Sequence, residues 1–193
     1  FDEFQKDSAL VDIPQQNRFY NNQILPLLQN NGRVYVIISD ALRYEVAAEL
    51  CDLLVAETKG TAKLSAMQSM FPSATPYGMA ALLPHKQITL DENLKVLCDG
   101  MSTDGTAARE KVLKTVGSGN VAITYKELLA MKQAERREKV ADAQVVYIYH
   151  NQIDARGDKL NTENEVFNAC TEAVEEISAL IRRLTTSANR SRF

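Results

Sequence analysis

The sequence predicts an α/β fold of the doubly wound type, in which a largely parallel sheet carries helices on both faces. Two apolar runs support this prediction. Residues 34–38 (VYVII) and 145–149 (VVYIY) are continuous apolar segments rich in β-branched side chains. Such runs are typical of strands that are covered on both faces in a parallel sheet. In addition, segments with helical spacing of apolar residues lie between the predicted strands, so that strands and helices alternate.

The remaining elements follow from the same spacing rules. Apolar positions 46, 47, 50, 53 and 54 recur at helical intervals and predict a helix over residues 43–57. Further helices are expected at 76–83, 106–115, 125–140 and 162–184. Further strands are expected at 63–67, 94–97 and 121–124. We expect a lead-in segment at 1–33, the α/β domain at 34–186 and an irregular tail at 187–193.

The last predicted helix has a clear start and a clear apolar face. Thr162 is a suitable cap residue, and Glu165 follows three residues later, which is the pattern of a capping box. The apolar stripe consists of Val166, Ala169, Ala173, Ile177 and Leu180, while Glu172, Glu175 and Glu176 are expected to face solvent. This helix is interpreted as a packing element.

Composition places the chain among ordinary globular proteins. It has 193 residues, of which 45% are hydrophobic and 24% are charged, and a net charge of −3. No apolar run approaches the roughly 18 residues of a membrane span, and no signal peptide is visible. The three cysteines lie far apart and indicate reduced thiols. We therefore expect a cytoplasmic protein without a membrane partner, and the net charge does not indicate nucleic acid.

Asp40 is the first candidate for chemistry. It follows the apolar run 34–38 after a single serine, and ligands of open α/β sheets bind beyond the carboxyl ends of the strands. Its carboxylate is a suitable oxygen ligand for a divalent cation. It could equally be the cap of the helix that follows, and position alone does not separate these interpretations.

Thr75 is the second candidate. It precedes Pro76, which is typical of a helix cap followed by proline in the first turn, and capping is the default interpretation. The same place suits a nucleophile, because free backbone N–H groups at a helix start favour a phosphate. A hydroxyl held there could attack phosphorus if a metal lowered its pKa. Ser73 is the competing nucleophile.

A third polar segment follows the apolar run 145–149. Asp154 and Asp158 are four residues apart, so one helical turn, or a tight turn at Gly157, would direct both carboxylates to one point. Taken alone, a solvated acidic loop is the better interpretation. The chain contains two histidines, His85 and His150, which are too few for a histidine-rich zinc site.

In their order along the chain, three motifs closely resemble the PglZ family, as found in BREX-type bacteriophage-defence systems. The motifs are VIISDALRYE at 36–45, PSATPYGMAALLP at 72–84 and YIYHNQIDARGD at 147–158. The resemblance runs from about residue 34 to the end of the long helix. It implies an alkaline phosphatase-like fold with two divalent metal ions, commonly zinc, acting on phosphate esters or phosphodiesters.

The resemblance also implies a role for each matching residue. Asp40 would bind the metal that activates the nucleophile, and Thr75 would be that nucleophile and also touch the metal. Asp154 and Asp158 would bind the second metal. Many superfamily members have histidine at the second of these positions, so Asp158 favours a harder ion such as manganese or magnesium. Arg43 would contact substrate, with a structural salt bridge as the alternative.

One motif of the superfamily has no counterpart in this sequence. The superfamily places an Asp-His pair after a later strand, and this chain contains no Asp-His dipeptide. We therefore expect an incomplete domain that holds no metal tightly and is inactive by itself, while the parent protein is a metal-dependent phosphatase or phosphodiesterase. The alternative is a non-catalytic scaffold that binds other defence subunits.

Overall fold

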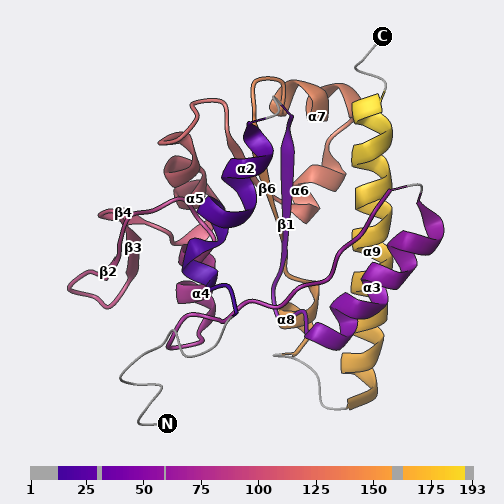
Figure 1. Cartoon of the computed structure of the whole chain (residues 1–193), viewed down its shortest axis with the longest axis horizontal. Helices are drawn as coiled ribbons and strands as arrows, with labels where there is room; N and C mark the ends of the chain where they lie inside the picture. The colour runs from indigo at the N-terminus through magenta and orange to yellow at the C-terminus, as the bar shows by residue number, and fades with distance from the viewer. Residues whose placement is uncertain (1–12, 30–31, 59, 158–162, 190–193) are drawn as a thin grey trace. The chain divides into compact units, whose positions relative to one another are not determined.

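The structure of the chain, a computed structural model, describes residues 13–29, 32–58, 60–157 and 163–189 (Figure 1). In chain order, the helices are η1 Gln16–Arg18, η2 Tyr20–Ile24, α2 Leu25–Leu28, α3 Tyr44–Glu57, α4 Thr75–Ala81, α5 Gly105–Lys114, α6 Tyr125–Ala130, α7 Gln133–Lys139, α8 Gln152–Gly157 and α9 Glu163–Asn189. The strands are β1 Val34–Ser39, β2 Ile88–Leu90, β3 Val96–Cys98, β4 Met101–Ser102, β5 Val121–Thr124 and β6 Val145–His150. The α/β class predicted from the sequence is confirmed.

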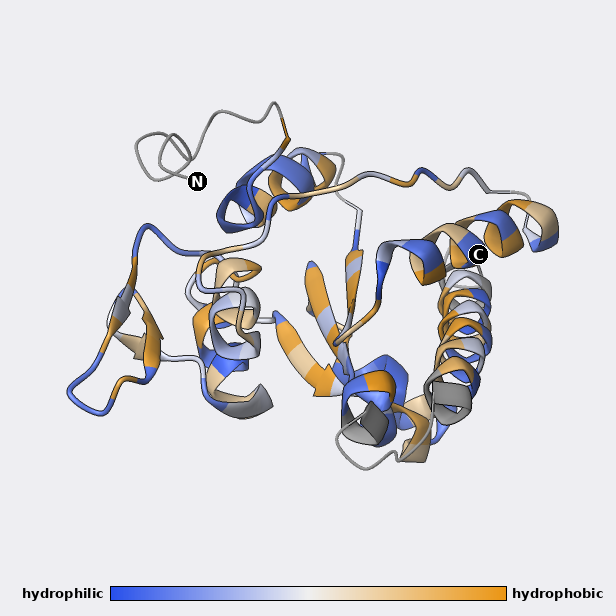
Figure 2. Cartoon of the chain, turned by 90° about the horizontal axis from the view of Figure 1, so that it is seen from below, coloured by the Kyte–Doolittle hydropathy of each residue, from blue (hydrophilic) through white to orange (hydrophobic). Residues whose placement is uncertain are grey.

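The central element is a parallel sheet with strand order β1-β6-β5, flanked by helices. The backbone N–H of Val34 donates to the carbonyl of Gln144 over 2.8 Å, and that of Asp40 donates to the carbonyl of His150 over 2.9 Å. From the first bond to the second, the donor advances by six residues and the acceptor also advances by six residues along the chain. This is the pattern of parallel strands. Figure 2 shows these strands mostly in hydrophobic colours, as expected for strands covered on both faces.

By its internal contacts the chain divides into two compact units. The first comprises residues 1–36, 66–123 and 131–146, and the second comprises residues 37–65, 124–130 and 147–193. The first unit contains the antiparallel sheet β2-β3-β4. Its fully buried side chains include Ala80, Ala81, Leu83 and Leu113.

In the second unit, helices α3 and α8 both pack on α9. The core of this unit includes Tyr147 and Ile148 from β6 and Ala169, Ala173 and Ile177 from α9. Tyr147 and Ile148 are completely buried, and each stabilises the fold by about 1.5–3 kcal/mol through the apolar surface it removes from water.

Three elements differ from the sequence-based prediction. Residues 61–67 form no strand, and the neighbouring Gln68 makes one isolated bridge to Gln15. The predicted helix 125–140 is two helices, because Glu135 accepts a 2.7 Å hydrogen bond from the N–H of Lys132 and starts a new helix there. The predicted strand 94–97 begins only at Val96, since Leu94 has a φ of 59° in a turn.

The predicted long helix is confirmed as α9, which continues to Asn189. Thr162, the residue proposed to cap it, lies outside the described residues. Within the part of the chain that the structure describes, no helix combines the length and apolar character needed to cross a membrane.

Candidate metal site at the carboxyl end of the sheet

Asp40 lies immediately after β1 and is half-buried. Helix α3 begins four residues later at Tyr44, with Arg43 at its N-cap position, so the interpretation of Asp40 as the cap of this helix is wrong. Instead, Oδ1 of Asp40 accepts a 3.0 Å hydrogen bond from the N–H of Ala41. Ala41 has a φ of 62°, a left-handed conformation that costs a non-glycine residue about 1–2 kcal/mol. The chain therefore turns sharply at the point where β1 delivers this carboxylate.

The second acid-bearing segment lies beside the first. The N–H of Asp40 donates a 2.9 Å hydrogen bond to the carbonyl of His150, the last residue of β6. Helix α8 starts at Gln152, and half-buried Asp154 lies in its first turn. The carboxyl ends of the two neighbouring strands thus carry Asp40 and the segment of Asp154 at the same edge of the sheet. Asp158 lies outside the described residues.

Thr75 is the first residue of α4, and Ala74 holds the cap position with extended backbone angles. The interpretation of Thr75 as the helix cap is therefore wrong, because its hydroxyl is one residue too late to cap the first turn. Both Thr75 and Ser73 are exposed. Thr75 belongs to the first unit, whereas Asp40 and Asp154 belong to the second. Its role as nucleophile stays a prediction.

Arg43 is exposed at the N-cap position of α3, where it forms no side-chain capping bond. Its side chain therefore does not stabilise the helix start by capping. A substrate contact by Arg43 also stays a prediction.

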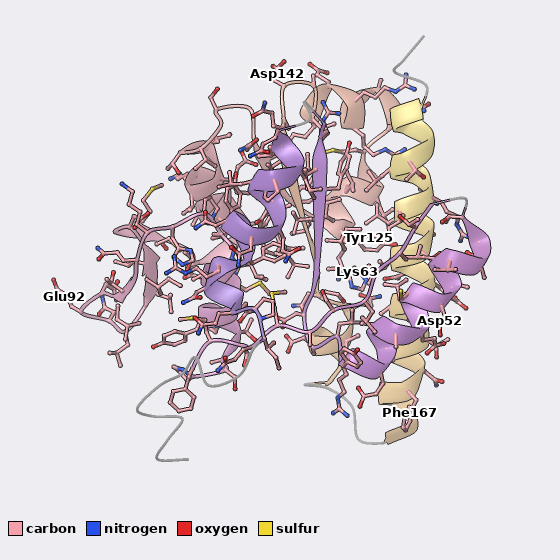
Figure 3. All side chains as sticks on the ribbon, in the orientation of Figure 1. Asp52, Lys63, Glu92, Tyr125, Asp142 and Phe167 are labelled. Atoms are coloured by element: carbon pink, nitrogen blue, oxygen red, sulfur yellow. The ribbon has the colours of Figure 1, made fainter. Side chains whose placement is uncertain are left out.

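A buried histidine lies at the same edge, and sequence reasoning did not anticipate its contacts. His150 is 1% exposed. Its Nδ1 is 2.9 Å from Oγ of Ser39, and its Nε2 is 2.9 Å from Oε2 of Glu176 on α9. Gln152 Nε2 donates a longer hydrogen bond of 3.4 Å to Oε1 of the same glutamate. Tyr125, labelled in Figure 3, meets the His150 ring edge-on with the ring centroids 5.0 Å apart.

The expectation that Glu176 faces solvent is wrong. Its side chain is 29% exposed and bonds to His150. The signal was present in the sequence, because Glu176 follows Ala173 by three residues and precedes Leu180 by four. Residues at these spacings share one helix face, so Glu176 lies beside the buried stripe of α9.

The charge of Glu176 also affects the pKa of its neighbour Tyr125. The pKa of Tyr125 is raised by burial and, to a lesser degree, by Glu176, with Arg183 opposing the shift. The phenol therefore stays neutral at physiological pH.

The side chains at this edge can be compared with what a divalent cation requires. Asp40 and Asp154 offer carboxylate oxygens, the donors preferred by hard cations such as Mg²⁺ and Mn²⁺. Both ring nitrogens of His150 are already hydrogen-bonded, so this histidine is not a free ligand. Among the described residues, no group of three or more potential ligands gathers at one point. The described side chains thus fit part of an oxygen-donor cation site.

Taken together, the fold and this site define an α/β domain whose parallel strands present acidic side chains at their carboxyl ends. Residues 19–192 match the family model of the BREX system PglZ alkaline phosphatase-like domain. The chain belongs to the PglZ family.

Two curated relatives agree with this assignment. The alkaline phosphatase-like protein PglZ of Bacillus cereus (strain H3081.97) is 41% identical over 182 residues. The alkaline phosphatase-like protein BrxZ of Escherichia coli O9:H4 (strain HS) is 42% identical over 185 residues. Each alignment covers 94% of this chain and 21% of the relative, so the chain spans about one fifth of their length. No solved structure matches the chain.

Proposed function

We propose that the protein containing this domain is a metal-dependent phosphatase or phosphodiesterase of a bacterial defence system. The observation that carries the proposal is the hydrogen bond between the N–H of Asp40 and the carbonyl of His150. It joins two acid-bearing segments at the carboxyl edge of a parallel sheet, which is where open α/β sheets bind their ligands. The alkaline phosphatase-like character of the family supports the same reaction class.

In this proposal the acidic residues divide between two cation sites. Asp40 would bind one divalent ion together with Thr75, and Asp154 and Asp158 would bind the other. Zinc is the ion that the family resemblance suggests, and the all-oxygen donors favour manganese or magnesium. When bound, such ions neutralise phosphate oxygens and lower the pKa of a nearby hydroxyl.

Thr75 is the proposed nucleophile. Its Oγ would lose its proton to solvent and attack phosphorus in line with the leaving group, so that the bond from phosphorus to the departing oxygen breaks as the bond to threonine forms. The departing oxygen would take up a proton from solvent. Water would then hydrolyse the phosphothreonine and restore the free hydroxyl. Arg43 would contact the phosphate of the substrate. The substrate is a phosphate ester or phosphodiester in the cytoplasm, and other defence subunits are proposed partners.

The test compares single variants of the full-length protein with a chromogenic phosphodiester and a phosphomonoester under zinc, manganese and magnesium. Asp40→Ala and Thr75→Ala should each lower turnover by at least about 100-fold without unfolding the protein. Ser73→Ala is the matched control for the nucleophile, because Ser73 is exposed two residues away. It should keep turnover near that of the wild type.

Two results would decide against this function. Full turnover of Asp40→Ala at saturating metal would show that this carboxylate holds no catalytic cation. A full-length wild-type protein that hydrolyses neither substrate with any metal would instead favour a non-catalytic scaffold for partner subunits.

A further inference from the structure

Glu176 lies on α9 and bonds to two residues of the segment that leads to Asp154. Its Oε2 accepts a 2.9 Å hydrogen bond from Nε2 of His150 at the end of β6. Its Oε1 accepts a bond of 3.4 Å from Gln152, two residues before Asp154. One carboxylate on α9 therefore holds both sides of the turn between β6 and α8.

His150 also contacts the end of β1. Its Nδ1 lies 2.9 Å from Oγ of Ser39, the residue directly before Asp40. Its backbone carbonyl accepts the N–H of Asp40 itself. Because a carboxylate only accepts hydrogen bonds, Nε2 is the donor to Glu176. The chain of contacts Ser39–His150–Glu176 thus runs from one acid-bearing strand end, through its neighbour, to the covering helix.

Burial restricts the orientation of the His150 ring. His150 is 1% exposed and is contacted on a further side by the ring of Tyr125, so it has little freedom to turn. A buried polar ring left without partners would cost on the order of 1–3 kcal/mol for each unsatisfied group. The ring orientation is therefore set by Ser39 and Glu176 rather than by solvent.

We propose that Glu176 is a positioning residue for the cation site: through His150 and Gln152 it holds the strand ends that present Asp40 and Asp154. This inference rests on the proposed function, in which both aspartates bind divalent ions. When a residue that hydrogen-bonds to a metal ligand is removed, the affinity of the site for the metal typically falls by about 10–100-fold. Glu176 should act in this way without touching the ion.

The experiment measures Mn²⁺ binding to the full-length protein by calorimetry, alongside thermal melting. Glu176→Ala should raise the Mn²⁺ dissociation constant by about 10–100-fold. Glu176→Gln retains an acceptor for His150 and should raise it only a few-fold. Glu175→Ala is the matched control, because Glu175 is an exposed glutamate on the same helix. It should bind Mn²⁺ as the wild type does.

Turnover provides a second readout that a purely structural role would not produce. Glu176→Ala should regain turnover within a few-fold of wild type once Mn²⁺ is saturating, since it alters affinity and not the reacting groups. If Glu176→Ala does not fold, Ser39→Ala cuts the same chain of contacts at its other end. This variant differs from the wild type by one oxygen atom and should also weaken Mn²⁺ binding.

The outcomes separate this inference from the function on which it rests. If Asp40→Ala loses Mn²⁺ binding while Glu176→Ala and Ser39→Ala bind it within twofold of wild type, the positioning role is refuted and the proposed cation site stands. If Asp40→Ala binds Mn²⁺ like the wild type, the cation site itself is refuted, and the positioning role falls with it.

Discussion

The side-chain oxygen of Asn120 accepts a 3.0 Å hydrogen bond from the N–H of Val145, the first residue of β6. The amide nitrogen of the same side chain donates to the carbonyl of Leu113 in α5 over 3.2 Å. Asn120 is 2% exposed, so neither backbone group has water as a substitute. One buried amide thereby ties the end of α5 to the start of the strand that leads to the candidate site.

Replacing this side chain should destabilise the fold. Asn120→Ala leaves a buried N–H and a buried carbonyl without their partner, and we expect a loss of about 2–3 kcal/mol in the free energy of unfolding. Urea denaturation measures it. Asn93→Ala, at an exposed position, is the control and should change stability by less than about 0.5 kcal/mol. Equal stability of the two variants would contradict the tethering role.

The carboxylate of Asp99 should make stability depend on pH. Hydrogen bonds from the backbone N–H groups of Gln87 and Lys86 lower its pKa. A lowered folded-state pKa contributes stability above the unfolded pKa of about 3.9, and this contribution is lost as the pH falls through the folded pKa. Asp99→Asn should therefore be less stable than wild type at pH 7, and the gap should shrink below about pH 4.

Asp99→Asn isolates the charge, since asparagine tolerates the left-handed backbone that Asp99 adopts at a φ of 48°. Urea midpoints at a series of pH values measure the effect. Glu92→Gln is the control, because Glu92 is an exposed acid in the same antiparallel hairpin. A gap between wild type and Asp99→Asn that stays constant with pH would contradict the assigned cause.

Gly119 should tolerate no side chain. A Cβ at this position would lie 2.2 Å from the backbone carbonyl oxygen of Asp142, which cannot rotate away. We expect Gly119→Ala to lower the free energy of unfolding by at least about 2 kcal/mol. Gly32→Ala is the control, because a Cβ there meets nothing within 4 Å. Thermal melts that coincide for both variants would show that the loop at Gly119 relaxes freely.

The isolated 193-residue chain should bind divalent metal weakly and hydrolyse no phosphoester. A catalytic ion needs about three protein ligands, and the ligands proposed in this chain are two for each ion. We expect Mn²⁺ or Mg²⁺ dissociation constants on the order of 0.1–1 mM or higher. Calorimetry and a chromogenic phosphodiester assay provide the measurement. Turnover that depends on metal and disappears in Thr75→Ala would show that this chain alone suffices.

The sequence by itself determined the fold class and the place of Asp40 at the end of β1. The runs that became β1 and β6 are apolar throughout, and such a pattern is typical of strands in a parallel sheet that carries helices on its faces. Asp40 follows one run after a single serine, so its position at the carboxyl edge of the sheet followed from local pattern alone. The motifs around Asp40, Thr75 and Asp154 also sufficed to identify the family.

Tertiary structure decided what local pattern leaves open. Residues 63–67 resemble a strand, but no strand in the described part of the chain pairs with them, and a strand is stable only with hydrogen-bonding partners. Glu176 resembles a solvent-facing glutamate until β6 places His150 opposite it. Both outcomes depend on contacts between residues far apart in the chain, such as the 26 residues that separate His150 from Glu176. Spacing along one element determines which face a residue occupies, whereas its partner across the core is determined only when the elements pack together.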